Sequence, residues 1–213
     1  MPTLLLVRHG ENDWLKKGIL VGNTPGVVLN ERGVEQACAL REALKSLPLR
    51  AIYSSPLQRA LETATPLAEA LGLPIQVRPG LADTDVGDWA GRELKELRRL
   101  PEWKQVQSEP SSFRFPGGES FAELQQRMVW EVEEILHLHK PRERLALFFH
   151  ADPIKLVLAH FLGMPLDQFQ KLSVAPGSIS ILTVNRAGAR LEGLNLQPTR
   201  EGQFPGRTQP DRG

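Results

Sequence analysis

Two histidines and two arginines lie where their side chains can act together chemically. Arg8 and His9 directly follow a short apolar run, Arg59 lies just beyond a second run, and His150 ends a third. A guanidinium donates hydrogen bonds in a fork that matches phosphate oxygens, and an imidazole can attack phosphorus or carry a proton. Any one of these residues alone is more often a structural polar group. The four together indicate an anion pocket that contains a nucleophile.

The apolar runs predict the strands that must position these residues. Short apolar segments at 4–7, 51–54 and 145–149 are typical of buried parallel strands. Further strands are expected at 75–78, 178–184 and 190–196, the last two joined by a hairpin-like turn. Because the carboxyl ends of parallel strands meet at one edge of a sheet, we expect the two histidines and two arginines to converge there.

Segments with helical spacing of apolar residues alternate with these strands. We expect helices to start near Asn30, Pro56, Ser120 and Pro153, with Asn30 as a cap and Ser120 with Glu123 as a capping box. This alternation predicts an α/β fold, a three-layer α/β/α sandwich with a mostly parallel central sheet.

The chain length predicts one domain over residues 1–197. The remaining residues, 198–213, are rich in Gly, Pro, Gln and Arg, and we expect this tail to be disordered. The segment 101–118 carries Pro, Gly and aromatic residues. It suits a cover over a ligand site as well as a plain surface loop.

Composition restricts the class of function. The sequence is 41% hydrophobic and 24% charged with a net charge of +1, which favours neither nucleic acid nor a membrane as partner. Cys38 is the only cysteine, so a disulfide within the chain and a Cys-based zinc cage are excluded. With no export signal recognised, we expect a cytoplasmic protein. The spacing of His137, His139 and His160 does not favour a metal site.

The motifs around these residues resemble those of the histidine phosphatase superfamily, which contains phosphoglycerate mutases and bacterial acid phosphatases. Residues 5–11, Leu-Leu-Val-Arg-His-Gly-Glu, look like the family signature. Further matching segments follow in order at 29–33, 54–60, 62–64, 85–91, 116–120 and 150–152. The resemblance covers about residues 3–185 and is closest to a small bacterial phosphatase branch similar to alpha-ribazole phosphatase. It implies a phosphoglycerate mutase-like fold.

The resemblance also implies roles for the four residues. His9 is expected to attack phosphorus and become phosphohistidine, with no metal or other cofactor. Arg8, Arg59 and His150 match the family's phosphate pocket, where they would bind the substrate and stabilise charge in the transition state.

Four further positions complete the expected site or depart from the family pattern. Gly10 is expected to let the backbone approach the phosphate, and Asn12 to donate from its amide. Asp83 stands where most relatives have a glutamate as general acid, and its carboxyl reaches about 1.5 Å less far. Asp83 can act as the general acid if the pocket raises its pKa or draws the carboxyl closer to the substrate. Asp85 is the alternative general acid, and a third possibility is that neither aspartate has this role. Leu15 replaces an asparagine that touches phosphate in many relatives.

The leading interpretation is a phosphatase that hydrolyses a small-molecule phosphate monoester, because the chain is shorter than usual for cofactor-dependent mutases. A mutase-type isomerase and a non-catalytic phosphate-binding protein on the same fold are the alternatives. The basic run at 92–99 is expected to be a solvated helix face, with contact to a second anionic group of the substrate as the alternative. The sequence leaves the substrate and the oligomeric state open, a homodimer included.

Overall fold

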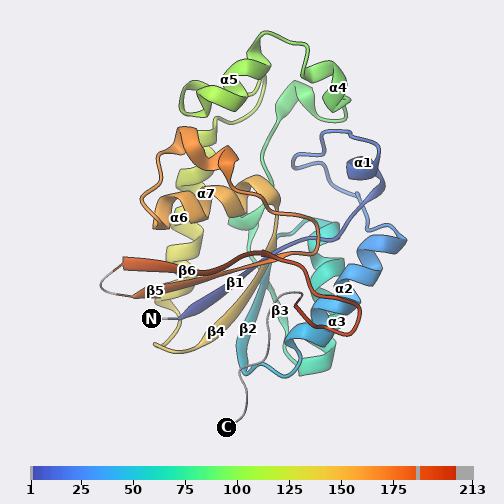
Figure 1. The fold of residues 1–213 in the computed structure, drawn as a ribbon, viewed down its shortest axis with the longest axis vertical. Coiled ribbons are helices and arrows are strands. Elements are labelled where there is room, and N and C mark those ends of the chain that lie inside the picture. The colour runs from blue at the N-terminus through green and yellow to red at the C-terminus, as the bar shows by residue number, and fades with distance from the viewer. Residues whose placement is uncertain (1, 186–187, 205–213) are drawn as a thin grey trace.

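A six-stranded sheet with the order β3-β2-β4-β1-β5-β6 forms the centre of the computed structural model, which describes residues 2–185 and 188–204 (Figure 1). The strands are β1 (Thr3–Arg8), β2 (Leu49–Ser54), β3 (Ile75–Val77), β4 (Arg144–Phe149), β5 (Ile179–Asn185) and β6 (Gly188–Leu196). The first four pair in parallel, whereas β5 and β6 are antiparallel additions. The predicted mostly parallel sheet is therefore confirmed. Two residues of the predicted turn between β5 and β6, Arg186 and Ala187, lie outside the described residues.

Helices cover both faces of the sheet. One face carries α2 (Glu31–Leu44) and α3 (Gln58–Leu71), and the other carries α6 (Phe121–His137) and α7 (Ala151–Phe161) (Figure 1). Side chains of β1 alternate accordingly: Leu5 and Val7 pack with α2 and α3, whereas Leu4 and Leu6 pack with α6 and α7. The two cores confirm the three-layer sandwich. The expected caps form as well: Asn30 accepts from the Gly33 amide, and Ser120 and Glu123 make a capping box.

The strand register brings the predicted site residues to one edge of the sheet. Arg8 at the end of β1 pairs with Phe149 at the end of β4, and Ser54 at the end of β2 pairs with Phe148. His9, His150 and the start of α3 therefore lie at the same edge of the sheet, as the apolar runs predicted.

The insert between β3 and α6 contains α4 (Leu94–Leu97), which lies within the helix face expected at 92–99. Its segment 101–118 is more regular than the loop that the sequence suggested, because it contains α5 (Glu102–Ser108) and a 3-10 turn at Pro110–Ser112. Trp89 lies 6.1 Å from the ring of Trp103, and Phe113 and Phe115 are buried beside it. In Figure 1, α4 and α5 lie beyond the sheet at the end opposite to the chain termini. Aromatic packing thus holds the insert over the edge where the histidines emerge.

The packed region continues past residue 197. Arg200 pairs with Glu35 on α2, the Thr199 amide donates to the Gln203 carbonyl, and Phe204 packs against the core beneath α2 and α3. The tail expected to be disordered therefore starts with a turn that lies on α2. Residues 205–213 lie outside the described residues. None of the described helices combines the length and apolar character needed to cross a bilayer.

Candidate active site

His9 is held with its ring nitrogens in distinct roles. Its Nδ1 lies 2.7 Å from the carbonyl oxygen of Gly10. Because a carbonyl can only accept, Nδ1 carries the proton and Nε2 keeps the free lone pair. The ring is 97% shielded from solvent, and burial, followed by the charges of its neighbours, places the pKa of His9 well below 6.5. His9 is therefore neutral at physiological pH, as a nucleophile must be.

Gly10 contributes to this arrangement in a way that the sequence did not indicate. Its amide donates to Thr63 Oγ1 at 3.0 Å, so this N–H is already engaged. A Cβ at Gly10 would lie 2.6 Å from the carbonyl oxygen of Gly33. The glycine is needed for close packing of the β1 end on the start of α2. Direct contact of Gly10 with phosphate, as first expected, stays a prediction.

Arg59 is fully buried in the first turn of α3 and ties three segments together. Its guanidinium donates to the carbonyl oxygens of Gly22 and Thr24, at 2.6 and 3.1 Å, and to Asp83 Oδ2 at 3.1 Å. Arg8 donates to the Val174 carbonyl at 2.6 Å. Both guanidinium groups are thus held in fixed orientations by carbonyl oxygens.

His150 lies next to His9, with ring centroids 5.2 Å apart. Its Nε2 is 2.8 Å from Ser55 Oγ, which itself accepts from the Leu57 amide. Its Nδ1 is 3.3 Å from Asp83 Oδ2, within ion-pair distance but without a well-directed hydrogen bond. With Asp83 ionised, this arrangement favours the proton on Nδ1 and a hydrogen bond from the Ser55 hydroxyl to Nε2. Ser55 is thus a positioning residue that sequence reasoning did not single out.

The structure distinguishes the two candidate acids by position. Asp83 lines the cavity with His9, and burial raises its pKa although Arg59 acts in the opposite direction. Asp85 Oδ1 instead accepts from the Gly87 amide at 3.1 Å within its own turn. The raised pKa of Asp83 therefore meets the condition stated above for an aspartate as general acid, whereas the Asp85 side chain is hydrogen-bonded to the backbone of its own turn.

A second ion pair fixes the segment that carries Asp83. Arg127 of α6 donates to the carbonyl oxygens of Gly80, Ala82 and Asp83 at 2.8, 2.9 and 3.2 Å. It also pairs with Glu119, whose Oε1 accepts from the Asp85 amide. No local signal in the sequence indicates this role, because the carbonyl oxygens belong to residues more than 40 positions away.

Several buried donors in the site lack a partner. Among the described residues, five buried side-chain polar atoms make no hydrogen bond: Arg8 Nε, Asn12 Nδ2, Arg59 Nε, His150 Nδ1 and Ser178 Oγ. The first four belong to residues assigned above to phosphate binding. An unsatisfied buried polar group costs about 1–3 kcal/mol, so four of them in one site call for an acceptor. A phosphate supplies several acceptor oxygens and negative charge.

A cavity of about 150 Å³ is lined by one of these four residues, Arg8, whereas Arg59 and His150 contact Asp83, which also lines it. Its polar lining includes Arg8, His9 and Asp83, whereas Leu15 and Phe115 form part of an apolar wall. Leu15 therefore lies in the site and replaces a donor by apolar surface. Phe115 brings the insert into contact with the cavity, so the segment 101–118 contributes to the wall of the site.

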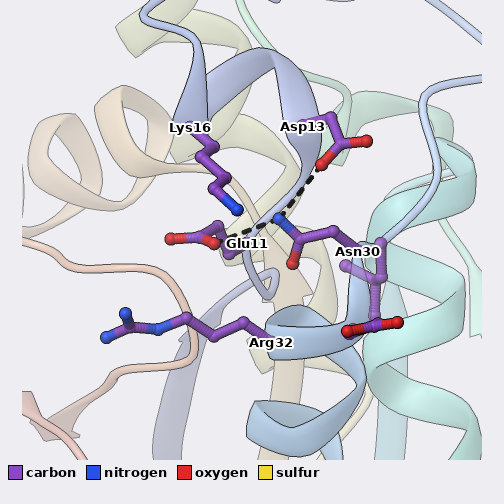
Figure 2. Close-up of a pocket in the computed structure, with 7 residues that line it drawn as sticks. Glu11, Asp13, Lys16, Asn30 and Arg32 are labelled. Carbon is purple, nitrogen blue, oxygen red and sulfur yellow. Dashed lines mark hydrogen bonds between the residues drawn. The ribbon is translucent and has the colours of Figure 1, made fainter.

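Figure 2 shows a different and wider cavity of about 650 Å³ between α1 (Asp13–Lys16) and the start of α2. The Asn30 amide donates there to Glu11 at 3.0 Å and to Asp13 at 3.5 Å. Lys16 and Arg32 also line this cavity, whereas neither His9 nor His150 does. With Glu31, three carboxylates and two cations line this cavity, so its lining carries a net negative charge and does not favour an anion.

The remaining histidines are structural or exposed. His139 contacts Tyr53 and Glu143, while His137 and His160 are exposed on helices. Within residues 2–185 and 188–204, no group of three or more His, Cys, Asp or Glu side chains is arranged to hold a metal.

Comparison with known proteins agrees with this geometry. The sequence model of the histidine phosphatase superfamily (branch 1) matches residues 4–197. Phosphoserine phosphatase 1 of Hydrogenobacter thermophilus is 32% identical over 201 residues, covering 92% of this chain and 93% of that protein. Adenosylcobalamin/alpha-ribazole phosphatase of Escherichia coli is 27% identical, covering 90% and 95%. The structure of a mycobacterial glucosyl-3-phosphoglycerate phosphatase with VO3 superposes with a TM-score of 0.83 at 28% identity, covering 91% and 98%. Phosphoglycerate mutases also match.

Proposed function

Because the chain belongs to the histidine phosphatase superfamily, we propose that it is a phosphomonoester phosphatase that acts through a phosphohistidine on His9 and needs no metal ion. The observation that carries the proposal is the set of buried, unpartnered donors on Arg8, Asn12, Arg59 and His150. These donors and two guanidinium charges supply the neutralisation of phosphate oxygens that a metal supplies in other phosphatases.

In the first half-reaction, His9 Nε2 attacks phosphorus in line. The N–P bond forms, the ester P–O bond breaks, and Asp83 gives its proton to the leaving oxygen. In the second, a water oxygen attacks phosphorus and the P–N bond breaks. Asp83 takes a proton from this water, and inorganic phosphate leaves. A raised pKa suits Asp83 to both steps, because the carboxyl must be protonated first and ionised afterwards.

The first experiment is a phosphate-release assay in EDTA. The panel contains p-nitrophenyl phosphate, phosphoserine, alpha-ribazole phosphate and glucosyl-3-phosphoglycerate, after the substrates in the relatives' names. We expect release by the wild type and by His160→Ala, whose side chain is exposed on α7, and none by His9→Ala. Acid-labile phosphate bound to the wild type but not to His9→Ala would identify the intermediate. Activity lost in EDTA and restored by a metal would contradict the proposal.

The matches to phosphoglycerate mutases favour a second candidate function, isomerisation of phosphoglycerate. An assay with 3-phosphoglycerate separates the two functions. If conversion to the 2-isomer outpaces phosphate release, the chain is a mutase. Phosphate binding without labelled His9 and without turnover would instead identify a non-catalytic binding protein.

We also propose a cytoplasmic location and a small phosphate ester as the partner. The single cysteine, Cys38, supports a reducing compartment because no disulfide within the chain is needed for stability. Cell fractionation with an antibody against the chain tests the location.

A further inference from the structure

A second cavity adjoins the catalytic one. The two share Leu20, Phe115 and Asp152 in their walls, and their volumes are about 150 and 190 Å³. We call the cavity with His9 the inner cavity and the other the outer cavity. Small-molecule sites usually measure about 300–1,000 Å³, so neither cavity alone reaches this range, whereas the two together reach its lower end.

Most of the side chains that line the two cavities are apolar. Beyond the phosphate-binding groups, the inner cavity presents Leu15 and Val86, and the outer cavity presents Leu94 and Trp103. Gln107 and Gln170 also line the outer cavity and can hydrogen-bond a leaving group, but apolar side chains make up most of its wall. The body of the leaving group is therefore expected to be apolar or aromatic.

The outer cavity also holds a cation without a partner. Arg98 lines it and is exposed, and within the described part of the chain its side chain makes no hydrogen bond or ion pair. Asp152 at the junction of the cavities is paired with Lys155 at 3.0 Å, so its negative charge is largely offset. Arg99, the next residue, is exposed but lines neither cavity. Of these two arginines, only Arg98 therefore presents its charge to a ligand in the outer cavity.

We propose that the outer cavity binds the distal end of the leaving group, and that Arg98 recognises a carboxylate there. The inference rests on the proposed phosphatase function and narrows its substrate class to phosphomonoesters with an apolar body and a remote carboxylate. A carboxylate close to the phosphate would remain in the inner cavity, which Arg98 does not line. The planar fork of a guanidinium matches a carboxylate in two parallel hydrogen bonds.

The test compares phenyl phosphate with 4-carboxyphenyl phosphate, which differ only in the remote carboxylate. For the wild type we expect kcat/KM to be about tenfold higher for the carboxylated ester, mainly through KM. Arg98→Gln should lose this preference, whereas the matched control Arg99→Gln should retain it. Comparing the ratio between variants cancels the different reactivity of the two phenols.

Added salt should reduce the preference of the wild type, because Arg98 is exposed. A wild type that does not prefer the carboxylated ester, or an Arg98→Gln variant that keeps the preference, overturns the inference while leaving the phosphatase function intact. If the wild type hydrolyses neither aryl ester but releases phosphate from another ester of the panel, this inference fails and the phosphatase function stands. If it releases phosphate from no ester, both fail.

Discussion

Replacing Asp83 by asparagine tests the least conventional part of the site. The change keeps the size of the side chain but removes the proton that we assign to the leaving oxygen. It also removes the charge that lies 3.1 Å from Arg59 and 3.3 Å from His150 Nδ1. The substitution therefore affects catalysis and phosphate binding in opposite directions.

The two effects differ in size. Loss of a general acid lowers kcat by about 10²- to 10⁴-fold. A carboxylate and a phosphate charge about 6 Å apart repel by roughly 3 kcal/mol at an effective dielectric constant of about 20. Asp83→Asn removes this repulsion. Because the cavity is open to water, we expect only about half of the repulsion energy to be gained in substrate binding, which corresponds to roughly a tenfold lower KM. Asp83→Asn should thus bind substrate more tightly and turn it over far more slowly.

The assay uses two leaving groups. An alkyl phosphate such as phosphoserine needs the proton, so its kcat should fall by the full 10²- to 10⁴-fold. p-Nitrophenolate leaves without one, so the variant should still form phosphohistidine from p-nitrophenyl phosphate and give a burst of product. Turnover should then stall, because no base activates the water.

The matched control is Asp85→Asn, which removes the charge of a side chain outside the cavity but keeps an oxygen that can accept from the Gly87 amide. It should change kcat less than tenfold for both substrates. An equal loss in the rate of phosphohistidine formation from alkyl and aryl esters in Asp83→Asn, or a larger loss of that rate in Asp85→Asn, would refute the assignment of Asp83.

Further predictions follow from the same contacts. Because the pKa of His9 lies well below 6.5, kcat/KM should not fall as the pH drops through 6.5, and a fall centred at about pH 6.5 would contradict this expectation. Because the pKa of Asp83 is raised, ionisation of Asp83 should cause kcat/KM to fall at higher pH, and this fall should vanish in Asp83→Asn. Ser55→Ala should lower kcat about tenfold and change the tautomer signals of His150 in ¹⁵N NMR, with rescue by Ser55→Thr. Arg127→Ala should slow alkyl esters more than p-nitrophenyl phosphate, as expected if it positions Asp83, and an equal loss would indicate a merely structural role. Gly10→Ala should lower the free energy of unfolding by about 1–3 kcal/mol in thermal denaturation, because its Cβ would lie 2.6 Å from the Gly33 carbonyl oxygen.

Much of the fold was accessible from local patterns. Apolar runs located the six strands, and caps at Asn30 and Ser120 located helix starts, because each signal acts within a few residues. The order of parallel strands places their carboxyl ends together, so the clustering of His9, Arg59 and His150 followed from position alone.

Other features depend on contacts between distant segments, for which spacing gives no signal. Arg127 acts on carbonyl oxygens more than 40 residues away, and Ser55 meets His150 across 95 residues. The close approach of Gly10 to Gly33 is likewise visible only in three dimensions. The helix at Glu102–Ser108 was missed because the Pro and aromatic content around it suggested a loop.

The place of β1 in the sheet has a consequence for how the protein opens. β1 is flanked by β4 on one side and β5 on the other, and its four central residues are buried. Its amides should therefore exchange with solvent deuterium only through global unfolding, whereas α4 and α5, with few ties to the sheet, should exchange through local opening. His9 would then stay in place while the segment that contains α4 and α5 opens locally. Substitutions in the segment that contains α4 and α5 can therefore alter which esters enter the site without altering the chemistry at His9.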